Sequence, residues 1–579
     1  MSGSESQISL KPYLEKIATA CNEVSKQDLI DVILGMAKEE PTSQRVAFLQ
    51  KIQSFMPETK SADKIVTDVE TILDEIQALK EAIAERIEAI ENGDYEYLDD
   101  WDWDDYHYDD EPDYISEEQI EALTDLFQDV ENLFFNDQIE DSITIYEALF
   151  NLKKKIDNND YALSELDVDF REERARYARC VYDTSDKNKR LDKFAAVMEL
   201  DASHRYNEFK INESYPLLQD VIDAREGEMA DLQSFVPTWK NLLVKMEIKG
   251  RPASLLIEVV NRLQGIEGVA KLARAWKNNQ PHGYLFWLNC LKTENRLDDI
   301  VEVSKEALQV FKKGDARETV SRFLIEAGEL LDNPEYVLEG IREKLFSKPC
   351  DDNLLGLQKE AIKQNKRGEL ETVLSFFAKQ QGMNDDGKSL YLKGLLMAGR
   401  LDDAFLMVKK SKSLGWSYGL NIGLVFGAVV LAVTDSGEHV TTIEDLLAGY
   451  ADKNTVYSYQ INIKEDDDDI TFHDEIIKGI KKNKFPKSKL VEYFNWALRI
   501  GRNRIDDIVS KQHRGAYKRA AQVLCSLAEV YVATKDVKKA TKIIHEYCKE
   551  KYNRHSAFKR EVNTVISGSR LLKNIVISA

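Results

Sequence analysis

Apolar residues recur at spacings of three and four along most of this chain, a pattern typical of amphipathic helices. The clearest example is residues 63–91, where the apolar positions are Ile65, Val69, Ile72, Ile76, Leu79, Ile83, Ile87 and Ile90. Such a seam fits either a coiled-coil dimer or intramolecular packing against the preceding helices, and we favour the second. Three shorter helices are predicted within 8–57. Residues 1–91 are therefore predicted to form a small N-terminal helical domain.

The next stretch breaks the pattern. Residues 91–114 hold twelve carboxylates and seven aromatic rings without one Lys or Arg. Like-charge repulsion and the lack of aliphatic residues exclude an ordinary core helix, so 92–114 is predicted to be a linker. Its rings are candidates for binding a basic partner or the chain's own basic C-terminal block. The candidates are six of the seven: Tyr95, Tyr97, Trp101, Trp103, Tyr106 and Tyr108.

From 115 to 433 the chain is predicted to form helix pairs. Ser116 begins a capping signature, followed by helices over 120–135 and 139–156 with Asn136-Asp137 at the turn. The phrase Arg-Leu-Asp-Asp recurs at 296–299 and 400–403, each time after an apolar helix. An acidic first turn suits the positive end of a helix, so each phrase is predicted to begin the second helix of a pair.

The spacing of these turns predicts the architecture. With further turns at Pro334 and Glu369, the landmarks stand about 31 to 38 residues apart, close to the 34 of tetratricopeptide-type helix pairs. We therefore predict an all-α fold of tetratricopeptide-like hairpins stacked into an α-solenoid, with looser periodicity over 164–250. The apolar run at 420–433 is too short for a membrane span and is predicted to be a buried repeat helix.

Residues 434–475 interrupt the repeats. A short helix is predicted at 443–450, and the segment then leads into four aspartates at 466–469. This stretch is predicted to be a loop or insertion and the boundary of a basic C-terminal helical domain at 476–579. That block holds 24 Lys and Arg against 8 Asp and Glu, whereas the whole chain has a net charge of −23.

The charge split suggests contacts with acidic surfaces. Lys511, Arg514 and Lys518, with Arg519 beside them, are predicted to lie on the basic face of one helix. A basic face is usually solvated or faces protein, and nucleic-acid binding through it stays an alternative.

Catalytic chemistry is not predicted. The sequence holds no phosphate-binding loop, dinucleotide fingerprint, nucleophile elbow or HExxH motif. Gly265-Ile266-Glu267-Gly268 lies inside a helical pattern without strand context. His545 and Cys548 are predicted to be helix packing rather than zinc ligands. We therefore expect no enzyme activity, cofactor or metal.

Two resemblances accompany this pattern. Residues 505–562 and the acidic-aromatic tract are similar to the helical regions of bacterial proteins that carry SWIM-type zinc fingers. The finger's Cys-x-Cys is missing, so its metal and nucleic-acid binding do not carry over. In size and two-part layout the chain is also similar to the accessory protein cut by the RNA-guided protease of type III-E CRISPR systems, which would imply a role in antiviral defence.

These observations predict a non-enzymatic scaffold or regulator that binds protein partners, at least one of them basic. One alternative is a regulator that a partner protease cuts within 434–475 to release a basic fragment. Six unpaired cysteines and the lack of signal-peptide features predict a reduced, cytoplasmic protein without a membrane segment. Partner identity, pathway and oligomeric state stay open.

Overall fold

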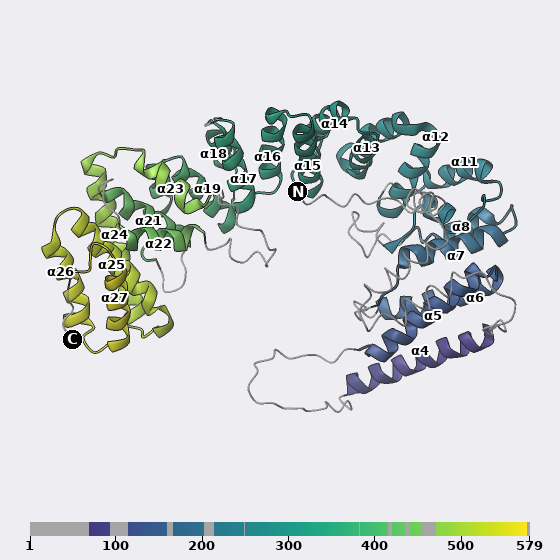
Figure 1. Cartoon of the computed structure of the whole chain (residues 1–579), viewed down its shortest axis with the longest axis horizontal. Coiled ribbons are helices and arrows are strands. Elements are labelled where there is room, and N and C mark those ends of the chain that lie inside the picture. The colour runs from purple at the N-terminus through teal and green to yellow at the C-terminus, as the bar shows by residue number, and fades with distance from the viewer. Residues whose placement is uncertain are drawn as a thin grey trace, which may run out of the picture. The chain divides into compact units, whose positions relative to one another are not determined.

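The structure is a computed structural model that describes most of the chain after residue 68. The described ranges are 69–92, 114–158, 166–201, 214–247, 249–366, 368–380, 382–414, 420–434, 440–452 and 470–575. The protein is 78% helical with 23 helices in contact and no strand among these residues (Figure 1). The predicted all-α repeat fold is confirmed. Three predicted features lie outside the described residues: the helices over 8–57, the linker rings and the four aspartates.

The chain divides into two compact units. Unit 1 comprises 1–133 and 144–166, and unit 2 comprises 134–143 and 167–579. The described helices of unit 1 are α4 (Val69–Asn92) and most of α5 (Glu117–Phe135) and α6 (Ile139–Asn158). The pair α5–α6 confirms the predicted hairpin.

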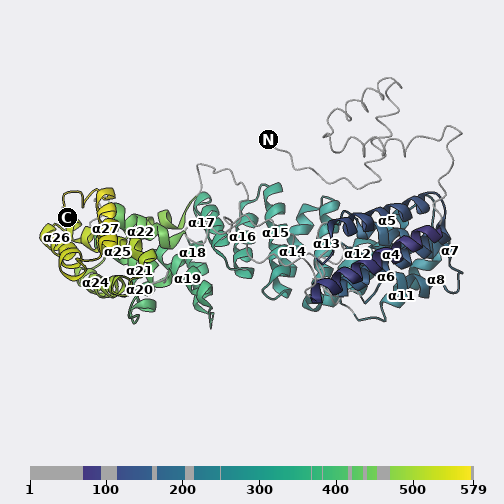
Figure 2. The ribbon, with the colours of Figure 1, turned by 90° about the horizontal axis from the view of Figure 1, so that it is seen from below.

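The long apolar seam of α4 faces the protein interior. Its central residues are buried, and they are Ile72, Ile76, Leu79 and Ile83. Glu75 acts electrostatically on Asp129, and Arg86 acts on Glu118. The earlier residue of α4 thus acts on the later residue of α5, and the later residue of α4 on the earlier one of α5. The two helices therefore run antiparallel (Figures 1 and 2). The helix beside this seam is α5, which follows the linker, whereas the helices over 8–57, against which we predicted the seam to pack, lie outside the described residues.

The start of α5 is fixed by its own side chains. The Ser116 N–H donates to Gln119 Oε1 at 3.1 Å, and the Gln119 N–H donates to Ser116 Oγ at 3.3 Å. This reciprocal pair satisfies two N–H groups that the first helical turn leaves without partners. The predicted capping signature is therefore correct.

Four hairpins form the regular part of unit 2. They are α13 (His282–Thr293) with α14 (Leu297–Val310), α15 (Asp315–Leu330) with α16 (Pro334–Ser347), α17 (Asp351–Lys363) with α18 (Glu369–Ala378), and α19 (Asp385–Met397) with α20 (Leu401–Val408). Two residues after the end of each first helix, the chain takes a positive φ. The residues with positive φ are Asn295, Asp332, Asn365 and Gly399, successively 37, 33 and 34 residues apart. The same turn therefore recurs with the predicted period.

The repeated phrase has one conformation in both copies. Arg296 Nε donates to Asp299 Oδ2 at 2.5 Å, and Arg400 Nε donates to Asp403 Oδ2 at 2.7 Å. The backbone N–H of each arginine donates to the carbonyl five residues earlier, which closes the end of the preceding helix. Each phrase thus ends one helix and begins the next, as predicted.

Less regular helices precede the hairpins. They are α7 (Phe170–Thr184), α8 (Arg190–Val197), α10 (Leu218–Asp223), α11 (Leu232–Leu243) and α12 (Gly250–Trp276). Together with α13–α15 they share one hydrophobic cluster that includes Trp239 and Tyr182. Gly265 interrupts α12 with φ 61° and ψ −164°, a backbone conformation that favours glycine.

Seven further α-helices follow the hairpins in the described part of unit 2. They are α21 (Leu420–Val433), α22 (Thr441–Ala451), α23 (Phe472–Lys481), α24 (Lys487–Val509), α25 (Tyr517–Ala533), α26 (Val537–His545) and α27 (Ser556–Gly568). A π-helical turn at Glu546–Lys551 follows α26. Most side chains of α21 are fully buried, as predicted for 420–433. Among the described helices, none combines the length and apolar character that a membrane crossing requires.

The predicted boundary at 434–475 does not separate two hydrophobic cores. One cluster of buried residues extends from Leu338 to Ile575. Helix α22 packs on α25 and α27, and α23 packs on α19 and α21. The fully buried carboxylate of Glu529 on α25 accepts the backbone N–H groups of Thr442 at 3.2 Å and Ile443 at 2.9 Å. Residues on both sides of the predicted boundary therefore share one interior.

Candidate interaction groove

The kink of α12 opens a groove against the first regular hairpin. Its volume is about 430 Å³, and its walls come from α12, α13, α14 and the turn between the last two. The apolar part of the lining consists of Ile266, Ala270, Trp287, Leu291 and Val303. Because Gly265 turns the helix axis there, the second half of α12 begins at the groove edge. The groove is therefore a product of the backbone conformation at this glycine.

One wall of the groove is a fixed polar cluster. Arg274 donates to both carboxylate oxygens of Glu306 at 2.8 Å, and Tyr284 Oη donates to Glu306 at 2.7 Å. The Arg274 guanidinium also lies 4.8 Å from the ring centroid of Trp287. Its hydrogen bonds are the main cause that lowers the pKa of Glu306, so this carboxylate is ionised at neutral pH.

The turn supplies a second set of charges. Arg296 pairs with Asp299 and with Glu294 at 3.4 Å. The groove thus holds five carboxylates and two guanidinium groups, and both guanidinium groups are already paired. Glu267 and Glu302 also line it and form no salt bridge with any described residue. The groove therefore carries an excess of negative charge.

The indole of Trp287 lines the groove, and its N–H group is buried. The side chain is 7% exposed, and its Nε1 has no hydrogen-bond partner among the described residues. A buried N–H without an acceptor costs about 1–3 kcal/mol. Because this N–H is enclosed by the protein, Trp287 contributes its ring rather than a donor to the groove lining.

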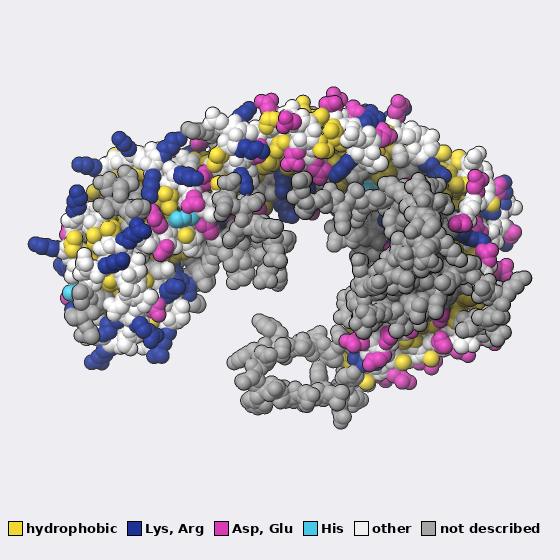
Figure 3. Space-filling view, viewed as in Figure 1, with side chains coloured by type: hydrophobic (Ala, Val, Ile, Leu, Met, Phe, Trp, Pro, Cys, Tyr) yellow, Lys and Arg dark blue, Asp and Glu magenta, His cyan; other side chains and the backbone are white. Residues whose placement is uncertain are grey.

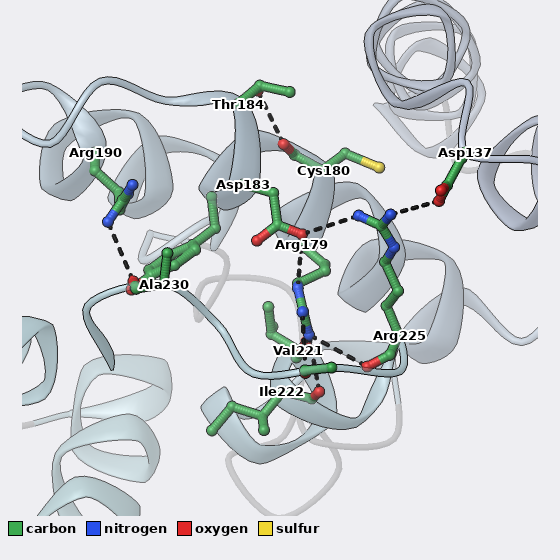
Figure 4. A network of polar contacts seen from close by, with 12 residues as sticks. Asp137, Arg179, Cys180, Asp183, Thr184, Arg190, Val221, Ile222, Arg225 and Ala230 are labelled. Carbon is green, nitrogen blue, oxygen red and sulfur yellow. Dashed lines mark hydrogen bonds and ion pairs between the residues drawn. The ribbon is translucent and has the colours of Figure 1, made fainter. Parts of the chain in front are cut away.

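Other buried polar clusters have structural roles. Arg179 on α7 donates to the carbonyls of Ile222 at 3.0 Å and Arg225 at 3.4 Å, and to Asp183 at 2.9 Å (Figure 4). Arg225 in turn bonds to Asp183. The guanidinium of Arg179 therefore closes the end of α10, where the helix leaves carbonyls without partners.

Four of the described cysteines are poor nucleophiles. Burial raises the pKa of Cys180 to about 12 and of Cys290 and Cys548 to about 11, and it raises the pKa of Cys525 well above its usual value. Each of these thiols is thus protonated at neutral pH, whereas nucleophilic attack needs the thiolate. Within the described residues, no group of three or more His, Cys, Asp or Glu side chains is placed to hold a metal ion.

The predicted basic helix over 511–519 is wrong. Helix α24 ends at Val509, Gln512 has φ 56°, and a short 3-10 turn precedes α25. The N–H of His513 donates to the carbonyl of Ile508 at 3.0 Å, which ends α24 in the same way as the hairpin turns. The charges around this turn therefore do not form one helix face.

The four predicted basic residues lie on both sides of that turn. Lys511 pairs with Asp507 at 3.2 Å at the end of α24. Arg514 is exposed in the 3-10 turn, while α25 carries the exposed Lys518 and the half-buried Arg519. The rings of the acidic-aromatic linker, Tyr95 to Tyr108, lie outside the described residues.

The groove itself was not predicted from the sequence. Its signal was the pair Gly265 and Gly268, which the periodicity placed inside one continuous helix. The helical context is correct, but the first glycine breaks the helix and the second permits close packing on Gln264. No known family model matches this chain, and the search of curated proteins found none that is significantly similar in sequence.

Proposed function

We propose that this protein is a non-enzymatic interaction scaffold whose groove over α12–α14 receives a basic segment of a partner protein. The observation that carries the proposal is the negative excess of a preformed groove with apolar walls at the start of the hairpin array. Helical-repeat proteins commonly use their extended surfaces to bind other proteins. A groove that exists before binding limits the entropy lost on association.

The partner chemistry follows from the groove's charges. Glu267 and Glu302 have no salt bridge with described residues, so a Lys or Arg side chain would gain a partner without breaking one. The paired guanidinium groups of Arg274 and Arg296 would keep their carboxylates. An acidic segment would instead meet like charge, which disfavours the wrong partner.

The test combines capture with position-specific crosslinking. A photo-crosslinking amino acid at Gln264, an exposed residue of the groove lining, is introduced into the full chain and exposed to lysate of the native host. The expected product joins this position to a segment rich in Lys or Arg. The double variant Glu267→Lys and Glu302→Lys should abolish the crosslink and weaken capture at least tenfold.

A matched variant controls for net charge. Glu228→Lys with Glu329→Lys makes the same charge change at exposed positions outside the groove lining. It should leave the crosslink and the capture unchanged. Equal loss in both double variants, or crosslinks only to acidic segments, would contradict the assignment of the groove.

A further inference from the structure

The C-terminal helices expose many Lys and Arg side chains to solvent, whereas most of their Asp and Glu side chains form salt bridges or are buried. Five of the eight acidic residues in 476–579 form salt bridges, and a sixth, Glu529, is buried. The five paired carboxylates are Glu492, Asp506, Asp507, Asp536 and Glu546. The remaining two, Glu550 and Glu561, have no salt bridge with a described residue. Little surface carboxylate therefore offsets the exposed cations.

The exposed cations are numerous. Twelve Lys and Arg side chains of this block are exposed and form no salt bridge with a described residue. They are Lys482, Lys484, Lys487, Arg514, Lys518, Lys535, Lys538, Lys542, Arg554, Arg560, Arg570 and Lys573. Figure 3 shows Lys and Arg side chains spread over the surface of α24–α27 with few Asp and Glu between them. This surface has a strongly positive local potential.

Helix α26 concentrates the charge in a groove. An open hollow of about 470 Å³ is lined by Lys538, Thr541, Lys542 and His545, with Val537 and Glu550 at its sides. Lys538 and Lys542 are one helical turn apart, so their positions differ by about 6 Å along the axis. His545 continues the same face, and its Nε2 has no partner among the described residues. That nitrogen is buried, so the exposed cations that line the hollow are Lys538 and Lys542.

The composition of this surface selects the ligand. No Phe, Tyr or Trp of the described residues 470–575 is exposed, and Val491 and Val537 are the exposed large apolar side chains there. Single-stranded bases need aromatic faces for stacking, and specific protein interfaces need buried aromatic or apolar anchors. Lysine ammonium groups without such anchors suit phosphate oxygens, which carry no base identity.

We propose that the α26 face binds the phosphate backbone of double-stranded nucleic acid without reading its bases. The contacts come from Lys538 and Lys542, with Lys535 from the preceding turn. Charges more than about 10 Å from this face are largely screened at 0.1 M salt, so its own cations dominate the interaction with phosphate. This function goes beyond the scaffold role and uses different residues from the α12–α14 groove.

The test is a salt titration of the full chain with a fluorescent duplex DNA, read by anisotropy. The triple variant Lys535→Ala, Lys538→Ala and Lys542→Ala is compared with Lys245→Ala, Lys271→Ala and Lys348→Ala, whose lysines are exposed elsewhere. Both variants lose the same charge. Loss of three phosphate contacts should reduce the slope of log affinity against log salt by about 2.7. Between 50 and 200 mM salt, the wild type should therefore lose roughly 40-fold more affinity than the α26 variant.

Each other outcome counts against the proposal. Equal slopes of log affinity against log salt in the two variants would show that the phosphate contacts do not come from the α26 face. Tighter binding of a single strand of the same length, or of a poly-glutamate peptide of equal charge, would show that the surface takes another class of anion. No measurable binding at 50 mM salt would also overturn it.

Discussion

Expressing the chain as two pieces, 1–458 and 466–579, tests whether the C-terminal block can leave the rest of the protein. A regulator that releases a basic fragment after cutting within 434–475 requires the pieces to separate. The hydrophobic cluster that extends from Leu338 to Ile575 predicts instead that they stay together.

The magnitude follows from the contacts across the division. The apolar side chains of α23 and α24 that are at most 5% exposed include Phe472, Ile476, Ile480, Tyr493, Trp496 and Ile500. At about 2 kcal/mol each they contribute about 12 kcal/mol to association. Hydrogen bonds such as that of Tyr493 Oη to Asp402 at 2.6 Å contribute about 3 kcal/mol more. After an association cost of about 7 kcal/mol, about 8 kcal/mol is left, a dissociation constant near 1 µM.

The assay is co-purification of the two pieces through a tag on one, followed by size-exclusion chromatography at 20 µM. We expect a single complex with one copy of each piece. Gly479→Ala in the smaller piece should weaken it about tenfold, because a Cβ there would overlap the carbonyl oxygens of Leu396 and Met397. Gly568→Ala is the matched control, since nothing lies within 4 Å of its added Cβ. Separate elution of the unmodified pieces would refute the shared core.

Four further substitutions test the repeat turn with its control, a buried cap and a titrating carboxyl. Gly399→Ala should lower the free energy of unfolding by about 2 kcal/mol in urea denaturation, because φ is 73° and the Cβ would overlap Asn483. In contrast, Gly356→Ala in α17 meets no atom and should raise it by about 0.5–1 kcal/mol. Glu529→Ala leaves the buried N–H groups at the start of α22 without an acceptor. Hydrogen exchange of the Ile443 amide should therefore accelerate by an amount equivalent to about 2–3 kcal/mol. Unchanged protection of this amide would contradict the capping role of Glu529. Burial raises the pKa of Glu258 from 4.5 to about 7, so its stabilising contribution is complete below pH 4.5 and is lost as pH rises to 7. Between pH 5 and pH 8 the free energy of unfolding of Glu258→Gln should therefore rise by up to about 3 kcal/mol relative to that of the wild type. Parallel pH profiles of the two proteins would contradict the raised pKa.

The helices of unit 2 were predictable because their signals are local. The phrase at Arg296 and its copy at Arg400 give the same turn, since an Asn or Gly with positive φ and an acidic first helical turn depend on neighbours in sequence. The same reasoning failed at 511–519. Gln512 takes the same positive φ there, but glutamine is unusual in that conformation, so its presence in the sequence does not predict a turn.

The sequence by itself determined the all-α class, the hairpin period and the concentration of positive charge near the C-terminus. These depend on apolar spacing, capping residues and composition, which can be counted along the chain. Only the tertiary structure decided that 434–475 does not divide the hydrophobic core and that an acidic groove forms beside Gly265. It also decided that most acidic side chains of the C-terminal helices form salt bridges. These outcomes depend on which residues distant in sequence come within contact distance, for example Glu529 with Thr442. Spacing along the chain carries no information on such pairs, because many partners with the same chemistry would satisfy the same local pattern.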